Sequence, residues 1–508
     1  MIRATNEILK EYEDLFEKRK AEIRNSVSCA DIKGTAYYVS SDGDDKNDGK
    51  SPDKAWKTLS KVSSAALNYG DGVLFRRGDI FRGYVPTVYD GVTYAAYGEG
   101  AKPVLCAGDK DYAKSELWEI YDEKNNIWKL TEKILDVGTL VFNHGEYHAK
   151  KLFPTFTEQG SFVCREDESK LFDVRDELVD DLDLYWHFDE RLTTFPDKEG
   201  CFPVPAVNDG YGELYLRCNA GNPGEVYDSV EALARRHMFY VGRCKDVKFD
   251  NLCIKYVGMH GIAGAWDVKG LTVSNCEFGW IGGTIHQYYG NDPNYPQGHR
   301  GQVGRFGNAV EIYGGCEDYT VSNCYVYQIF DAGLTHQFTA PYKTVMKNVK
   351  YTDNIIEKCV YGIEYFLEIE EGGEESMMEN IEMSRNFIRL GGYGWGQQRH
   401  NIHTPALIKG WSFENTAKNY RITDNIFDRC AYRLLHTVAK KKDSCPIMDG
   451  NTYIQNFSTS LGQYGHNEVK EPENMVFDEN ADKKICEILG DNNAKVIYVV
   501  TQELNCEL

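Results

Sequence analysis

The most regular pattern in the chain is a short repeat of apolar and polar residues in its second half. Six segments align on an asparagine that precedes alternating apolar positions, at spacings of 24, 48, 31, 32 and 39 residues. About 24 residues suffice for one solenoid coil of three short strands and three turns, and longer spacings leave room for loops or a second coil. A polar residue recurring at one turn predicts a ladder of hydrogen-bonded amides. The aligned residues are Asn251, Asn275, Asn323, Asn354, Asn386 and Asn425.

Each repeat also contains a strand in which apolar residues alternate with others. We align Val310, Leu334 and Ile363 as the buried rungs of successive coils. Strand side chains alternate between the two faces, so the residue after each rung points outward. The resulting outward column reads Ala263, Glu311, Thr335 and Glu364, then a coil whose loop obscures the register, then His436.

The first hundred residues are patterned differently. Residues 5–26 carry apolar side chains on one helical stripe, and Thr5 stands where an N-cap belongs. Residues 35–83 predict a strand at 36–39, a polar turn, a helix at 56–67 and a strand at 72–75. Residues 111–236 do not repeat and predict a β-rich insertion, which we expect to be a small sandwich packed on the solenoid.

The motifs YYVS, DGxxxxDGxSPxxAWKTL and GDxVLFxRGDxFRG resemble the N-terminal cap of right-handed parallel β-helix proteins, the pectin-lyase-like group of carbohydrate-active glycoside hydrolases and polysaccharide lyases. The resemblance covers residues 35–110 and 237–460, and it implies that a helix plugs the open end of the solenoid. The predicted fold class is therefore all-β, a right-handed parallel β-helix with an N-terminal helical cap and an inserted β-rich subdomain. The predicted divisions are an N-terminal helix (1–34), the cap and first coils (35–110), the insertion (111–236), the β-helix with active-site loops (237–470) and a C-terminal cap (471–508).

The composition of the chain limits its possible binding partners and its cellular compartment. The 508 residues carry 57 basic and 78 acidic side chains, a net charge of −21 that disfavours nucleic acids and anionic membranes as partners. No leader-like apolar segment opens the sequence and no run is long enough to span a membrane. The 15 dispersed cysteines are typical of a reducing compartment, so we expect a cytoplasmic protein. Cys276, Cys324, Cys359 and Cys430 are interpreted as apolar stacks inside the solenoid and not as metal ligands. Oligomeric state is left open.

The candidate catalytic residues lie on or beside the outward column. Glu311 and Glu364 lie two coils apart, and Asp331 precedes the intervening strand, so the three acids are predicted to converge. Mutual repulsion and burial would raise the pKa of at least one of them, as a general acid requires. Residues 285–306 and 393–404 form long loops on the same side. They and the neighbouring strands supply the candidate substrate-binding residues His286, His299, Arg300, His336, Gln337, Trp395, Arg399 and His436.

The leading hypothesis is a glycoside hydrolase for an oligo- or polysaccharide, with Asp331 and Glu364 as the working pair and Glu311 binding a hydroxyl or tuning their pKa. A wide pair, Glu311 with Glu364, would indicate inversion, and a close pair containing Asp331 would indicate retention. The alternatives are a lyase, in which the acids would hold Ca²⁺ and Arg300, Arg399, Lys409 or a loop histidine would be the base, and a non-catalytic glycan-binding solenoid. A zinc site is disfavoured because the histidine-rich loops lack regular ligand spacing, so no metal or other cofactor is predicted for a hydrolase.

Overall fold

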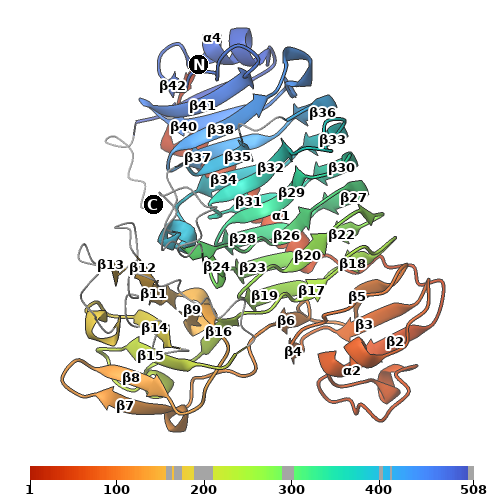
Figure 1. The fold of residues 1–508 in the computed structure, drawn as a ribbon, viewed down its shortest axis with the longest axis vertical. Helices are drawn as coiled ribbons and strands as arrows, with labels where there is room; N and C mark the ends of the chain where they lie inside the picture. Colours follow the sequence, from red (N-terminus) through yellow and green to blue (C-terminus); the bar gives the residue numbers. More distant parts are fainter. Residues whose placement is uncertain are drawn as a thin grey trace.

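The computed structural model describes residues 1–155, 163–164, 174–187, 210–288, 303–399, 404–411 and 415–500. Short strands wind into a right-handed parallel β-helix (Figure 1), which confirms the predicted fold class. Each coil gives one strand to each of three long sheets, and the strand pairs in parallel with its counterpart in the next coil. Among the helices of the described residues, none is both long enough and apolar enough to cross a membrane.

The first sheet is 14-stranded and runs the length of the solenoid. At its N-terminal end it continues into antiparallel strands of the insertion. Its strands, in spatial order, are β1 (Ile2–Arg3), β43 (Lys495–Val499), β40 (Thr452–Asn456), β37 (Ile426–Cys430), β34 (Phe387–Gly391), β31 (Ile355–Glu357), β28 (Tyr325–Ile329), β23 (Glu277–Ile281), β19 (Cys253–Val257), β16 (Val230–Ala234), β9 (Val137–Phe142) and β10 (Tyr147–His148), with β6 (Val104–Cys106) beside β19 and β4 (Ile80–Arg82) beside β6.

The second and third sheets complete each coil. The second contains β2 (Ala36–Val39), β3 (Gly72–Arg76), β5 (Thr93–Tyr97), β18 (Lys248–Asp250), β22 (Thr272–Ser274), β27 (Cys316–Ser322), β30 (Val345–Thr352), β33 (Met377–Ser384), β36 (Ala417–Thr423) and β39 (Ile447–Asp449), with β21 (Val268–Lys269) beside β27. The third contains β17 (Phe239–Tyr240), β20 (Ile262–Ala265), β26 (Val310–Tyr313), β29 (Ala332–Ala340), β32 (Tyr361–Ile369), β35 (Ala406–Gly410), β38 (Arg433–Ala439), β41 (Thr459–His466) and β42 (Met475–Phe477).

The interior of the solenoid is a continuous stack of apolar side chains. Val310, Leu334 and Ile363 occupy one register of the third sheet, and Ile408 and Leu435 extend the same row. All five are essentially inaccessible to solvent, so the predicted rungs are confirmed. Cys276, Cys324, Cys359 and Cys430 are buried free thiols, as predicted for an apolar stack.

The predicted asparagine ladder forms, but as two columns and not one. Strand pairing places Ser274, Ser322 and Thr352 in one register, so Asn275 and Asn323 are equivalent to Asp353 and not to Asn354. Asn323 donates to Asn275 Oδ1 at 2.6 Å in the outer column. A buried inner column begins at Asn354 and continues through hydrogen bonds of 3.0, 2.9 and 3.1 Å to Asn386, Asn425 and Asn451. The prediction that all six asparagines occupy one position was wrong by one residue, because two neighbouring positions of the turn both favour asparagine. The outer position has a positive φ, and the inner position has buried amide groups that need hydrogen-bond partners.

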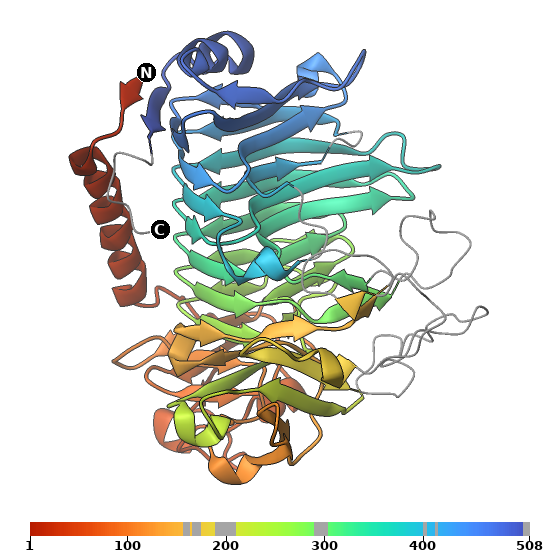
Figure 2. The same cartoon turned by 90° about the vertical axis from the view of Figure 1, so that its left-hand side faces the viewer.

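Helix α1 (Asn6–Asn25) lies lengthwise along the first sheet (Figure 2). Thr5 caps it as predicted, accepting a hydrogen bond from the amide of Ile8. Phe16 is fully buried and meets the rings of Tyr325 and Phe387 edge to face. Ahead of the helix, β1 pairs in parallel with β43 at the opposite end of the molecule from β2 and β3.

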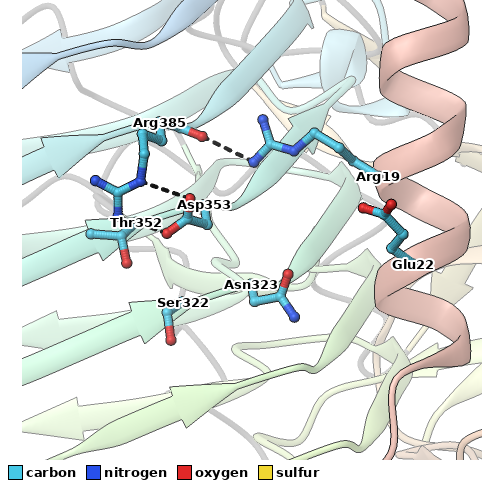
Figure 3. Close-up of a pocket in the computed structure, with 7 residues that line it drawn as sticks. All are labelled: Arg19, Glu22, Ser322, Asn323, Thr352, Asp353 and Arg385. Atoms are coloured by element: carbon cyan, nitrogen blue, oxygen red, sulfur yellow. Dashed lines mark hydrogen bonds and ion pairs between the residues drawn. The ribbon is translucent and has the colours of Figure 1, made fainter.

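A polar hollow separates the C-terminal half of α1 from the turns of three coils (Figure 3). Arg19 and Glu22 face it from the helix, and Asn323, Asp353 and Arg385 face it from the solenoid. Arg19 donates to the carbonyl of Arg385 at 2.9 Å. The helix is therefore attached by its apolar stripe and by hydrogen bonds to the turns.

The short helix α2 (Leu59–Ser64) buries Leu59 and Val62 against the first coils. Figure 1 shows it at the end of the solenoid beside β2 and β3. It is shorter than the predicted helix at 56–67, because Trp56 instead bridges to the strand at Val39. The helix covers the open end, as the resemblance implied.

The insertion contributes a five-stranded sheet made of β11 (Lys150–Leu152), β14 (Asp183–His187), β15 (Glu213–Arg217), β8 (Ile127–Leu130) and β7 (Trp118–Asp122). Its apolar face packs on β9 and β16 through a cluster that includes Leu140, Leu184 and Leu216. The second layer of this small sandwich is thus the solenoid's own first sheet, extended by the insertion.

Candidate active site

The outer face of the third sheet presents one column of side chains across successive coils. Glu311 follows Ala263, and Thr335 pairs with Glu364, as the alternation predicted. The member of the outward column that the sequence did not assign is Lys409, whose strand position pairs with Glu364 on one side and His436 on the other. The complete column reads Tyr240, Ala263, Glu311, Thr335, Glu364, Lys409, His436 and Gln463.

The turn between the first and third sheets brings Asp331 to the edge of this column. The Asp331 amide donates to the carbonyl of Gly307 at 3.2 Å, and its carbonyl accepts from Tyr361 at 3.0 Å. Asn308 spans the neighbouring coils, because its Oδ1 accepts from the amide of Ala332 at 2.8 Å and its Nδ2 donates to Glu311 Oε2 at 2.8 Å. Coil-to-coil hydrogen bonds therefore fix the backbone at Asp331, and Asn308 holds the side chain of Glu311.

Asp331 is buried and forms an ion pair with Arg399, through Oδ1 and Nη1. Arg399 comes from the loop that follows the 3₁₀ turn Trp395–Gln398, and its guanidinium lies over the rings of Phe306 and Tyr361. Burial raises the pKa of Asp331. Arg399 acts in the opposite direction and stabilises the carboxylate, so Asp331 is the acid of the site with a direct cationic partner of its own.

Glu364 lies on the next coil in a different environment. It is 5% exposed, and Trp411 donates its indole N–H to Oε1 at 2.5 Å. Burial, followed by repulsion from Asp331, raises the pKa of Glu364 to about 8. Glu364 is therefore protonated at neutral pH. Burial raises the pKa of both acids, but Asp331 alone of the two has a direct ion pair, and such a difference in environment is how a site assigns the proton to one of two acids.

Lys409 adjoins Glu364 and is buried with its charged end against aromatic rings. Its Nζ lies 3.8 Å from the centroid of Trp411 and donates to His436 Nδ1 at 2.6 Å. Burial lowers the pKa of Lys409 to about 7 and that of His436 to about 2. His436 is therefore a neutral acceptor, and Lys409 exchanges its proton near physiological pH.

Glu311 is held by histidines that the sequence reasoning did not single out. His260 Nδ1 lies 2.5 Å from Glu311 Oε2, and its ring stacks on His237 with centroids 5.1 Å apart. His286, a predicted binding residue, meets His260 edge to face at 5.3 Å, and burial lowers its pKa well below the usual value. One signal was available: His260 stands three residues before Ala263 in the column, as Asn308 does before Glu311.

The insertion fixes both loops that flank the acids. Asp136 accepts from the amide of Ile285 at 3.0 Å, at the start of the hairpin β24 (Ile285–Tyr288) and β25 (Val303–Arg305). Arg305 closes this hairpin by donating to the carbonyls of Gly283 and Gly138. Gln398 ties the second loop to the insertion, donating to the carbonyl of Ala149 at 2.9 Å and accepting from the amide of Lys151 at 3.2 Å. Because Gln398 precedes Arg399, the insertion also helps to place the cation beside Asp331.

Two predicted binding residues do not reach this face. His336 points into the solenoid, fully buried, where its ring stacks on Tyr365 and contacts the hydroxyls of Tyr351 and Tyr420. Strict alternation places it there, since its neighbour Thr335 is outward. Trp395 is 2% exposed and packs on Phe330 in the apolar cluster that joins the insertion to the solenoid. The prediction that these two side chains bind substrate was wrong.

Gln337 lies on the outer face, in the register of Tyr313 and Phe366. His299 and Arg300 fall outside the described residues. Within the residues that the structure describes, no group of three or more His, Cys, Asp or Glu side chains is placed to hold a metal ion. Each acid of the site instead lies near a basic side chain: Asp331 near Arg399, Glu364 near Lys409, and Glu311 near His260.

Comparison with known proteins gives a short list of similarities. No family model matches the chain. A lacto-N-biosidase from Bifidobacterium longum subsp. longum is 38% identical over 126 residues, which is 22% of this chain and 8% of that protein. The chain thus matches less than a tenth of the length of this curated relative.

Several solved structures align with most of the chain at low sequence identity, among them the following two. A complex of XylC with xylose has a TM-score of 0.43 at 12% identity, covering 92% of this chain and 83% of the other. A GH136 lacto-N-biosidase from Eubacterium ramulus has a TM-score of 0.39 at 13% identity, covering 97% and 70%.

Proposed function

We propose that the protein is a glycoside hydrolase whose catalytic pair is Glu364 and Asp331. The observation that carries the proposal is the contrast between the two acids on adjoining coils. Glu364 is buried with a raised pKa and accepts an indole hydrogen bond, whereas Asp331 is paired with Arg399. A glycosidase needs one carboxyl group that holds a proton and one that does not, on either side of the bond to be cleaved.

In this mechanism Glu364 donates its proton to the glycosidic oxygen as the bond to the anomeric carbon breaks. The Asp331 carboxylate attacks that carbon and forms a glycosyl-enzyme ester. Glu364, now ionised, then takes a proton from water, and the water displaces Asp331. Asp331 and Glu364 lie on adjoining coils, close enough for the charge of Asp331 to raise the pKa of Glu364, and retaining enzymes hold their two carboxyl groups closer together than inverting enzymes do. We therefore propose retention of the anomeric configuration.

Glu311 and the cations bind and orient the sugar. Glu311, fixed by Asn308 and His260, is an acceptor for a sugar hydroxyl. Trp411, which is half-buried and donates its indole N–H to Glu364, offers ring surface for the apolar face of a pyranose. The partial similarity to a lacto-N-biosidase makes a lacto-N-biose glycoside the first substrate to try.

The test is hydrolysis of a panel of aryl glycosides, beginning with the lacto-N-bioside, by the wild type and by Glu364→Gln, Asp331→Asn and Glu311→Gln. We expect kcat to fall by about 10³-fold or more for the first two variants and less for the third. Glu368→Gln, four residues along the same strand, is the matched control. Proton NMR of the first product gives the anomeric configuration. Full turnover by both Glu364→Gln and Asp331→Asn would refute the assignment and leave a glycan-binding solenoid.

A second candidate function is favoured by Lys409. A polysaccharide lyase removes the proton at C5 of a uronate with a base and neutralises the carboxylate with a cation. Lys409 has a pKa of about 7, and Arg399 and Arg433 lie on neighbouring coils of the same edge. Such an enzyme forms an unsaturated sugar that absorbs in the ultraviolet, and a hydrolase does not. Absorbance that grows with a polyuronate and is lost in Lys409→Met would replace the hydrolase proposal by this one.

A further inference from the structure

A second hollow, distinct from the one beside α1, lies on the outer face of the third sheet at the N-terminal end of the outward column. It has a volume of about 490 Å³. Four parts of the chain line it: the segment after β4, the insertion, the residues that enter β17, and Met259 in the turn between β19 and β20. Its lining includes Tyr84, Tyr211, Tyr240, Arg235, Arg236 and His237.

The three tyrosines are unusually exposed for aromatic residues. Tyr84 is 42% exposed, Tyr211 50% and Tyr240 39%. An isolated exposed ring needs no explanation, but three from distant segments around one hollow form a surface of the kind that suits a flat apolar ligand with a polar rim. The faces of pyranose rings have this character.

The hollow is linked to the candidate active site by a shared strand column and by a hydrogen bond. Tyr240, Ala263 and Glu311 are successive members of the outward column, so the strands of Tyr240 and Glu311 are two spacings apart, ~10 Å. His237 lines the hollow and accepts a hydrogen bond from the amide of His260, the residue that contacts Glu311.

The polar groups of the hollow are already ordered. Arg236 is paired with Asp109 at 2.6 Å, lies over the ring of Tyr84 at 5.2 Å and donates to the hydroxyl of Tyr211 at 3.4 Å. Arg235 is buried and donates to the carbonyl of Ile285, at the foot of the active-site hairpin. Arg236 therefore fixes two of the three rings in place, so little conformational entropy would be lost when a ligand stacks on them.

We propose that this hollow is a remote sugar-binding subsite, which stacks one pyranose unit of the substrate on Tyr240 and its neighbours. It lies several strand spacings from Asp331 and Glu364, where the glycosidic bond is cleaved. The inference rests on the proposed function for the identity of the ligand. It specifies that the substrate is an oligosaccharide chain lying along the solenoid axis and not a single glycoside. A short substrate does not reach the hollow, and a longer one gains affinity from it.

The experiment compares Tyr240→Ala with Tyr240→Phe, which keeps the ring, and with Tyr69→Ala, an exposed tyrosine outside the site. Two readouts are taken for a series of oligosaccharides of increasing length that share the cleaved unit. One is kcat/KM, and the other is calorimetric binding to the Glu364→Gln variant of each protein. Burying one aromatic ring face corresponds to about tenfold in affinity. In Tyr240→Ala we therefore expect a loss of about tenfold for the long members only.

The outcomes separate the subsite from the catalytic proposal. Length-dependent binding that Tyr240→Ala abolishes and Tyr240→Phe retains supports the subsite, even if no member of the series is hydrolysed. Equal losses for short and long members, or an unchanged preference for length in Tyr240→Ala, would overturn it while leaving the roles of Asp331 and Glu364 unaffected. Failure of the wild type to bind any member of the series would also overturn it.

Discussion

Replacing Glu364 by glutamine tests the central electrostatic feature of the site without any knowledge of the substrate. Glutamine has the shape of a protonated glutamic acid, and its carbonyl oxygen can accept the same hydrogen bond from Trp411. The variant therefore keeps the packing of the wild type, and the only ionisable group that it removes is the carboxyl group of Glu364. Any difference in pH dependence between the two proteins reports the proton on Glu364.

The magnitude follows from the two pKa values of this carboxyl group. In the unfolded chain Glu364 ionises near its ordinary value of 4.5, and in the folded protein near 8. Between these pH values the folded wild type holds a proton that the unfolded chain has released, so its stability falls as the pH rises through this window. One pKa unit corresponds to about 1.4 kcal/mol, which sets an upper bound of roughly 5 kcal/mol. Asp331 and Lys409 share the titration, so we expect about 2 kcal/mol.

The assay is denaturant unfolding of the wild type, Glu364→Gln and Glu371→Gln at a series of pH values from 5 to 9. Glu371 lies in an exposed acidic loop and controls for the loss of one negative charge. We expect Glu364→Gln to be more stable than the wild type at pH 8 by about 2 kcal/mol and nearly equal to it at pH 5. A difference that is absent at pH 8, or that shrinks as the pH rises, would mean that Glu364 is ionised in the folded protein and is not the acid.

Three further changes have defined outcomes. Arg399→Gln removes the cation that lowers the pKa of Asp331, so the acidic limb of the kcat/KM profile should move to higher pH by about one to two units; an unmoved limb would show that the ion pair does not tune the nucleophile. Gln398→Ala frees the second loop from the insertion and should lower kcat/KM about tenfold while shifting the melting temperature by less than about 2 °C; a large thermal shift with normal kinetics would make its role structural only. Asn386→Ala leaves buried partners of the inner amide column unsatisfied and should cost roughly 2–4 kcal/mol of unfolding free energy. The control is Asn380→Gly: Asn380 has a φ of +56° and belongs to a separate row of amides on the second sheet, where it donates to Asn348 and accepts from Asn419. This change should cost less than about 1 kcal/mol; equal costs would contradict the inner column as a stabilising element.

The solenoid and much of its acidic column could be predicted because both depend on alternation along strands. Glu311, Thr335 and Glu364 fell into one register once the apolar rungs were aligned. Lys409 could not be placed, because residues 392–405 interrupt its coil and remove the spacing on which the register depends. The amide ladder was misaligned for a related reason: two neighbouring turn positions both favour asparagine, and only strand pairing distinguishes them.

The remainder of the site depends on contacts between distant segments, which spacing does not contain. The link from Gln398 to Ala149 and Lys151 joins residues about 250 positions apart, and the stack of His237 on His260 depends on the turn geometry of two coils. His336 and Trp395 are predicted to bind substrate from their residue types and from their positions in or beside the long loops. Both satisfy their polar atoms internally, on tyrosine hydroxyls and on a backbone carbonyl, and a sequence does not reveal that a histidine or tryptophan has found such a partner.

The pairing of β1 with β43 has a consequence for how the molecule comes apart. A linear solenoid in which each coil touches only its neighbours can fray from either end, one coil at a time. Here the first strand of the chain hydrogen-bonds beside the last coil, and α1 is attached along the coils between. Opening the last coil therefore also releases β1 and loosens α1, so the two ends of the solenoid are coupled through a segment that belongs to neither. We expect this tether to make unfolding more cooperative than stacking alone, and to make the assembly of the last coil the slow step of folding, since the contact joins residues nearly 500 positions apart.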